Sequence, residues 1–185
     1  SLERGIECFE ERPSRHILLE KKVKSSAPDP KIPTKEAILV VDDEFGPRES
    51  LRMILKPLYE VYTASDGQEA LRLIGDKDID VVTLDLNMPG LSGIEVLKEI
   101  KKLRPNTEVI IVTGYGSLGN ASEAIRFGAG DFISKPFDVA EIISIVAKSF
   151  ERRNFNLKIK GLSERMQGLR SAPDDALESD KKDGG

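Results

Sequence analysis

Five polar side chains directly follow short apolar segments of this 185-residue sequence, and their types suit phosphoryl chemistry. They are Asp42, Asp43, Asp85, Thr113 and Lys135. A carboxylate can attack phosphorus and hold the phosphoryl group as an aspartyl phosphate. A cation such as Lys135 and a hydroxyl such as Thr113 can bind the equatorial oxygens of the group in transfer. The residue types therefore indicate a pocket that receives a phosphoryl group.

The charge of this set requires cations. The three aspartates carry about −3 if all are ionised, and two carboxylates about 4 Å apart repel each other by roughly 4 kcal/mol at an effective dielectric constant near 20. Lys135 supplies one positive charge, and a divalent cation would bring the site to about neutral. Because the ligands would be oxygen atoms with no His or Cys nearby, the set favours Mg²⁺ or Mn²⁺ over zinc or copper.

Alternating apolar runs and helical patterns are predicted to position these residues. We expect strands at 37–41, 61–63, 81–84, 109–112 and 132–133, and helices at 47–56, 68–74, 93–103, 117–127 and 139–152. Near-continuous apolar strands in β/α repeats predict an α/β fold, a doubly wound five-stranded parallel sheet with helices on both faces. Functional residues in such sheets collect at the carboxyl ends of the strands, so the five polar residues should converge in one shallow pocket.

Composition divides the chain into three segments. Residues 1–36 have the composition of a charged, proline-rich linker, residues 37–153 form the domain, and residues 154–185 form a polar extension that we expect to be largely disordered. One alternative stays open at the last boundary. Leu157, Ile159 and Leu162 would prolong the final helix toward a coiled-coil-like linker, although Gly161 weakens that helix.

Global properties exclude several classes of protein. A net charge of −4 argues against a nucleic-acid or anionic-membrane surface on this domain. No apolar run approaches the roughly 20 residues that cross a bilayer, and the first residues lack the pattern of a signal peptide. The single cysteine, Cys8, forbids an internal disulfide, and we expect a cytoplasmic protein.

Four motifs at the strand ends resemble response-regulator receiver domains of two-component signalling. They are Leu39–Glu44, Asp85–Gly90 with Gly93, Thr113–Tyr115 and Phe132–Pro136, and the resemblance covers about residues 37–153. It implies a flavodoxin-like fold and a Mg²⁺-dependent transfer of a phosphoryl group from a histidine kinase or phosphotransfer protein. The phosphorylated domain then switches conformation to regulate an output partner or domain. The family catalyses only its own phosphorylation and dephosphorylation.

The same resemblance assigns the catalytic and metal-binding roles. Asp85 is the phosphoacceptor and a metal ligand. Asp43 binds Mg²⁺ directly, Asp42 binds it mainly through water, and the backbone carbonyl of Asn87 is a further ligand. The remaining catalytic roles fall to Thr113 and Lys135, which hold the phosphoryl oxygens, with a cis bond before Pro136.

The resemblance also implies how the signal switches and how long it lasts. Phe132 occupies the position of the switch aromatic and pairs in that role with Thr113. Because Phe132 has no hydroxyl, its switch must work through packing. Asn87 can orient a water for hydrolysis of the aspartyl phosphate, and Tyr115 can cover the water's approach, so these two residues are expected to govern the phosphate lifetime.

Other interpretations of the same residues remain open. Asp42–Asp43 could be a helix-capping pair, and Asp85 could be a turn residue. A phosphatase resembling the haloacid dehalogenase family needs a second carboxylate two residues after its nucleophile, and Asn87 cannot act as that general acid. A non-phosphorylated interaction module is the third alternative, disfavoured by the complete set of site residues.

A homodimer is a further expectation of the resemblance. Its interface would be the face formed by the fourth helix, the fifth strand and the fifth helix. Charged residues of both signs lie on these elements: Glu123, Arg126, Asp131, Lys148 and Arg152. Exposed ion pairs contribute only about 0–1 kcal/mol each, so this face alone predicts weak association.

Overall fold

The computed structural model describes residues 35–114 and 118–170. The predicted linker at 1–36 therefore lies outside the described residues except for its last two, and the segment 171–185 also lies outside them. Within the described ranges, no helix combines the length and the apolar character needed to cross a membrane.

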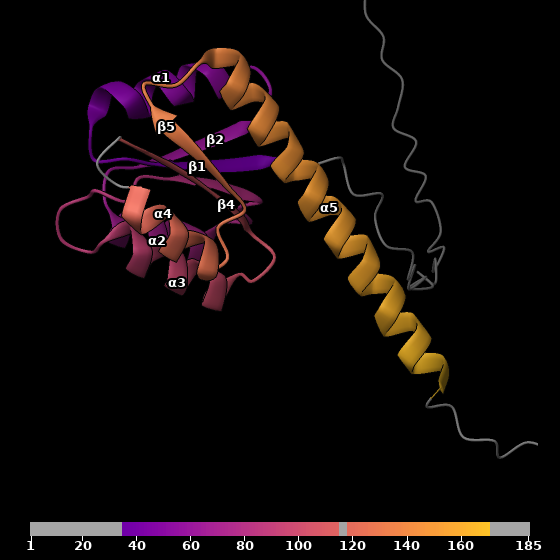
Figure 1. The fold of residues 1–185 in the computed structure, drawn as a ribbon. Helices are drawn as coiled ribbons and strands as arrows, with labels where there is room; N and C mark the ends of the chain where they lie inside the picture. Colours follow the sequence, from indigo (N-terminus) through magenta and orange to yellow (C-terminus); the bar gives the residue numbers. More distant parts are fainter. Residues whose placement is uncertain (1–34, 115–117, 171–185) are drawn as a thin grey trace, which may run out of the picture. The chain divides into compact units, whose positions relative to one another are not determined.

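The described residues form one five-stranded parallel sheet with the strand order β2-β1-β3-β4-β5 (Figure 1). The strands are β1 (Ala37–Val41), β2 (Glu60–Ala64), β3 (Val81–Leu84), β4 (Glu108–Gly114) and β5 (Asp131–Lys135). The helices are α1 (Phe45–Leu55), α2 (Gly67–Asp76), α3 (Gly93–Leu103), α4 (Leu118–Arg126) and α5 (Val139–Arg170). After β2 the chain crosses to the other side of β1, which confirms the predicted doubly wound α/β fold.

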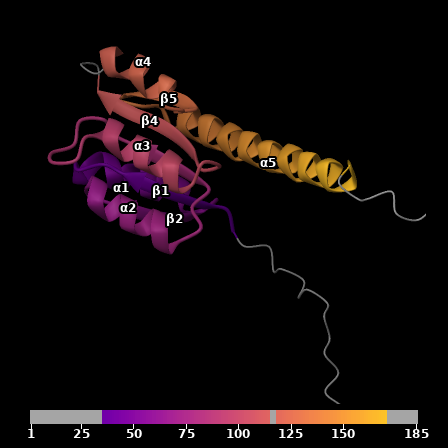
Figure 2. The same ribbon diagram turned by 90° about the horizontal axis from the view of Figure 1, so that it is seen from below.

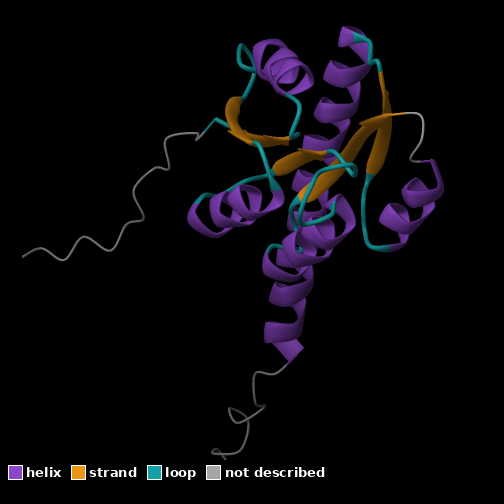
Figure 3. Ribbon diagram, turned by 90° about the vertical axis from the view of Figure 1, so that its left-hand side faces the viewer, coloured by secondary structure: helices purple, strands orange, loops and turns teal. Residues whose placement is uncertain are grey.

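Helices cover both faces of the sheet (Figure 1, Figure 3), and an apolar layer lies on each face. Ile38 and Val40 face α1 and α5, whereas Leu39 and Val41 face the layer that contains α2, α3 and α4. All five residues of β1 are buried because helices cover both of its sides. This explains why the central strands read as continuous apolar runs and not as alternating patterns.

A close backbone approach fixes the start of α3 beneath the loop that follows β3. Ser92 and Glu95 form a reciprocal capping box at this helix end. The backbone nitrogen of Gly93 donates to the carbonyl of Leu86 at 3.3 Å. A Cβ atom on Gly93 would lie 2.4 Å from the carbonyl oxygen of Asp85, a distance that no side chain can tolerate. Glycine at this position therefore permits the helix to support the Asp85 loop.

Helix α5 differs most from the sequence expectation. The other predicted bounds agree with the structure to within two residues, but α5 continues to Arg170 and does not end near residue 152. The prediction of a largely disordered extension is therefore wrong for residues 154–170. Ten of the 17 residues in this stretch are Leu, Lys, Arg, Glu, Gln or Met, which favour helices, and no proline interrupts it. Gly161 and Gly168 each cost only about 1 kcal/mol.

We predict that Gly93→Ala lowers the free energy of unfolding by about 1–3 kcal/mol, because the new methyl group must displace backbone next to Asp85. Urea unfolding measures this change. Gly75→Ala is the matched control, because nothing lies within 4 Å of a Cβ atom at this helical position. The control should raise stability by about 0.5–1 kcal/mol. Equal effects of the two substitutions would contradict the close approach at Gly93.

Candidate functional site

The carboxyl ends of β1, β3, β4 and β5 bring the predicted polar residues to one edge of the sheet. Asp42 and Asp85 directly follow β1 and β3, and their backbone nitrogens donate to Ala64 and Val41 at 3.2 and 3.0 Å. Parallel pairing thus continues to the first residue beyond each strand. Both side chains are almost fully buried, as expected at the point where the strand order turns.

Asp85 accepts hydrogen bonds from three donors on different elements. Its Oδ1 accepts from the backbone nitrogen of Asn87 at 2.9 Å and from Thr113 Oγ1 at 2.8 Å. Its Oδ2 accepts from Lys135 Nζ at 2.6 Å. Burial opposes the charged form, but these hydrogen bonds outweigh it and hold the pKa of Asp85 below its usual value. Asp85 is therefore an ionised carboxylate at neutral pH.

Lys135 joins the carboxylates of two strands. Its Nζ lies 2.7 Å from Asp42 Oδ2 and 2.6 Å from Asp85 Oδ2, with Glu44 farther away at 3.7 Å. Burial would lower the pKa of Lys135, but hydrogen bonds to Asp42 and Asp85 raise it, so the ammonium form is retained. Desolvation dominates at Asp42 and raises the pKa of that carboxyl. The bond between Lys135 and Pro136 is cis, as expected.

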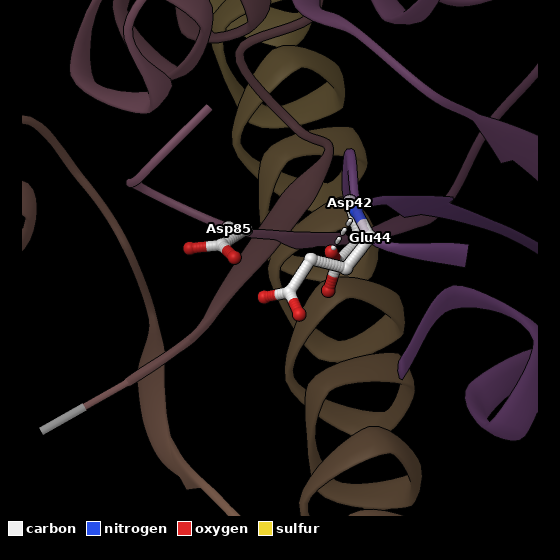
Figure 4. A group of neighbouring side chains, drawn as sticks. All are labelled: Asp42, Glu44 and Asp85. Atoms are coloured by element: carbon white, nitrogen blue, oxygen red, sulfur yellow. Dashed lines mark hydrogen bonds between the residues drawn. The ribbon is translucent and has the colours of Figure 1, made fainter. Parts of the chain in front are cut away.

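Three carboxylates could share a cation at this edge. Oxygens of Asp42, Glu44 and Asp85 lie within 4.8 Å of one another, and Figure 4 shows the side chains of Glu44 and Asp85 converging on one space. Two carboxylates at this separation repel by about 3 to 4 kcal/mol at an effective dielectric constant of 20, which a cation relieves. An all-oxygen donor set suits a hard ion such as Mg²⁺. The residues present therefore fit the expected divalent cation.

This acidic group differs in one member from the set expected from the sequence. Glu44 belongs to it, whereas Asp43 does not belong to it in the described part of the chain. Glu44 belongs to the first strand-end motif, but no role was expected for it. Its position three residues after the end of β1 was the available signal. A direct Asp43–metal contact stays a prediction, as does a role for the Asn87 carbonyl.

A pocket of about 550 Å³ opens beside Asp85 and Lys135. Its lining comes from the strand ends and from the first turns of α1: Glu44, Pro47, Ser50, Asp85, Asn87, Gly114, Lys135, Pro136 and Phe137. Asn87 is exposed at this rim, so its side chain can meet a ligand. The sequence pattern gave no signal for Pro47, Ser50 or Phe137, because their approach to the pocket depends on how α1 and the loop after β5 pack.

Of the residues expected to govern the switch and the phosphate lifetime, the structure describes Phe132 but not Tyr115. Phe132 is half-buried and packs against the apolar layer that includes Ala124 of α4. Tyr115 lies outside the described residues, so its predicted shielding of the phosphate stays a prediction.

Comparisons with known proteins agree with this geometry. Residues 38–147 match the model of the family described as "Response regulator receiver domain". The chain is 40% identical to sporulation initiation phosphotransferase F of Bacillus subtilis over 61% of the chain and 92% of that relative. It is 36% identical to regulatory protein AtoC of Escherichia coli over 70% of the chain but only 28% of AtoC. A crystal structure of NtrX from Brucella abortus in complex with ADP matches with a TM-score of 0.67 and 36% identity, covering 70% of this chain and 30% of that one.

We predict that Mg²⁺ stabilises the protein through the acidic group. At a free concentration of ten times its dissociation constant, a bound ion adds about 1.4 kcal/mol to the free energy of unfolding. Thermal melts with MgCl₂ and with EDTA measure this gain. Asp42→Asn should remove most of the Mg²⁺-dependent gain, whereas Asp78→Asn should leave it intact because Asp78 is exposed and distant in the fold from the acidic group. A gain that survives Asp42→Asn would contradict the site.

Two further variants test whether Glu44 or Asp43 is the third metal ligand. The side chain of Glu44 is 66% exposed, so it is poorly held for binding a metal. We therefore expect Glu44→Gln to keep more of the Mg²⁺-dependent gain in melting temperature than Asp43→Asn does. The reverse order would make Glu44 the ligand and remove Asp43 from the site.

Proposed function

The chain belongs to the response regulator receiver domain family, and on this premise we propose that Asp85 accepts a phosphoryl group from the phosphohistidine of a histidine kinase or phosphotransfer protein. One observation carries the proposal: the buried carboxylate of Asp85 lines the pocket and accepts hydrogen bonds from three donors. The proposed receiver spans residues 37–153. We propose no chemistry for it beyond its own phosphorylation and dephosphorylation.

The transfer forms one bond and breaks another. An oxygen of Asp85 bonds to phosphorus while the P–N bond of the donor breaks. The electron pair of that bond returns to the imidazole nitrogen, which takes up a proton from solvent. Lys135 and Thr113 already touch the two oxygens of Asp85. As negative charge develops on the phosphoryl oxygens, Lys135 and Thr113 can therefore donate their hydrogen bonds to those oxygens with little movement.

Mg²⁺ fits among the carboxylates of Asp42, Asp85 and a third acidic residue, either Asp43 or Glu44. When bound, Mg²⁺ supplies positive charge for the phosphoryl oxygens. Lys135 contributes one fixed charge beside Asp85. Asn87 at the rim of the pocket orients the water that later removes the phosphate, and Tyr115 opposes that approach.

The switch is proposed to run from Thr113 to Phe132. Thr113 leaves Asp85 Oδ1 to donate to the phosphoryl group, and the space that it vacates favours a new packing position for Phe132 against α4. Paired β4 and β5 residues link the two positions, because Ile111 lies opposite Phe132 and Thr113 opposite Ser134. The altered surface of α4, β5 and α5 then regulates an output partner or domain.

Phosphorylation is also proposed to change self-association through this face. Glu123, Arg126 and Lys148 are exposed and available for contacts between copies. Arg152 already binds Asp131 of its own chain at 2.9 Å, so this pair contributes less to an interface than the sequence suggested. A switch in packing, and not charge alone, would have to strengthen the association.

We predict that Asp85→Asn abolishes phosphorylation and leaves the fold intact, because the amide keeps the shape of the side chain but is not a nucleophile. The measurement is intact mass after incubation with Mg²⁺ and a small phosphodonor such as acetyl phosphate. Asp78→Asn is the matched control and should gain one phosphoryl group like the unmodified protein. A retained mass gain in Asp85→Asn, or none in the unmodified protein, would overturn the assignment.

A further inference from the structure

Helix α5 carries two apolar stripes on nearly opposite sides. Its first half buries Ile142, Val146 and Phe150 against the sheet. Its second half exposes four large apolar side chains: Phe155 (62%), Ile159 (51%), Leu162 (54%) and Met166 (62%). With 3.6 residues per turn, the exposed stripe points almost directly away from the buried one. The receiver to which α5 belongs therefore cannot cover the second stripe.

Three successive side chains anchor α5 where the two stripes meet. Arg152 binds Glu108 and Asp131 at 3.0 and 2.9 Å, Arg153 binds Asp80 at 2.7 Å, and Asn154 donates to Glu36 at 3.0 Å. These partners lie at the amino ends of β1, β3, β4 and β5. The direction of the helix is thus fixed at this turn, and α5 continues beyond the sheet (Figure 2).

The spacing of the exposed stripe is that of a coiled-coil seam. Intervals of four, three and four residues separate Phe155, Ile159, Leu162 and Met166, which places Ile159 and Met166 at a positions and Phe155 and Leu162 at d positions. Ile159 and Leu162 provide a β-branched residue at a and a leucine at d, a combination that favours two parallel strands. We propose that residues 155–166 of two copies of this chain pair as a parallel two-stranded coiled coil.

The charges beside the seam support the parallel orientation. Lys158 and Arg165 occupy the g positions, and Asn156 and Ser163 occupy the e positions. In a parallel pair each g residue faces an e residue of the partner, so the basic side chains meet neutral ones. In an antiparallel pair g residues face each other, which would bring Lys158 against Arg165. Like charges in contact disfavour that arrangement.

This pairing does not depend on phosphate chemistry. The seam comprises about two heptads, which are marginal on their own, so the association should be weak and visible as a dependence on concentration. The seam uses none of the residues of the Asp85 pocket or of the proposed face on α4, β5 and α5. Failure of either of those proposals would leave this one standing.

Sedimentation equilibrium of the full chain without a phosphodonor tests the pairing. We expect the mass to rise from that of a monomer toward twice that value as concentration increases. Ile159→Glu/Leu162→Glu should raise the dissociation constant at least tenfold. Leu157→Glu is the matched control, because the same change on the opposite side of the helix should leave association unchanged. Circular dichroism checks that each variant keeps its helix content.

Three outcomes would overturn the proposal. The first two are a monomer at all concentrations and unchanged association of the Ile159→Glu/Leu162→Glu variant. The third is that only Arg126→Glu/Lys148→Glu, which changes the face on α4, β5 and α5, abolishes association. Orientation has its own test. Met166→Cys in a Cys8→Ser background should form an intermolecular disulfide on oxidation, because only parallel helices place the two copies of residue 166 side by side. A dimer without this disulfide would contradict the parallel arrangement.

Discussion

One ammonium group between two buried carboxylates holds the carboxyl edge of the sheet together. Lys135, the last residue of β5, contacts Asp42 and Asp85, which directly follow β1 and β3. Removing the cation would leave two desolvated negative charges next to each other, an arrangement that costs several kcal/mol. The same cation lies beside the carboxylate that we propose as the phosphoacceptor. Structural stability and chemical reactivity therefore depend on one interaction.

Ion pairs at the amino edge of the sheet anchor α5. Arg152 bridges Glu108 and Asp131, and a Cβ atom on Gly130 would lie only 2.3 Å from its guanidinium. Glycine there leaves the room that this arginine needs. These ion pairs hold α5 against the strands. Between the two charged edges the sheet is apolar on both faces, so the site and the anchor of α5 are separated by packed core.

The relatives place this domain in proteins of different size. The chain covers 92% of sporulation initiation phosphotransferase F but 28% of AtoC and 30% of NtrX. What is shared with all three is the receiver, so the activities of the larger proteins do not follow from the likeness. Among the residues that the structure describes, α5 extends past the receiver, and its direction is set at Arg152–Asn154.

The sequence by itself determined the fold class and four of the site residues. Apolar runs that end in Asp42, Asp85, Thr113 and Lys135 are enough, because parallel strands bring their carboxyl ends to one edge whatever the loops do. Tertiary structure decided which atoms meet. The local pattern could not show that Lys135 would bind Asp42 as well as Asp85, or that Glu44 and not Asp43 would join the acidic group, since side-chain direction depends on packing across the sheet. The sequence pattern also did not determine where α5 ends, because beyond residue 153 helix propensity favours a helix whereas polar composition favours disorder. The structure shows that the helix continues to Arg170.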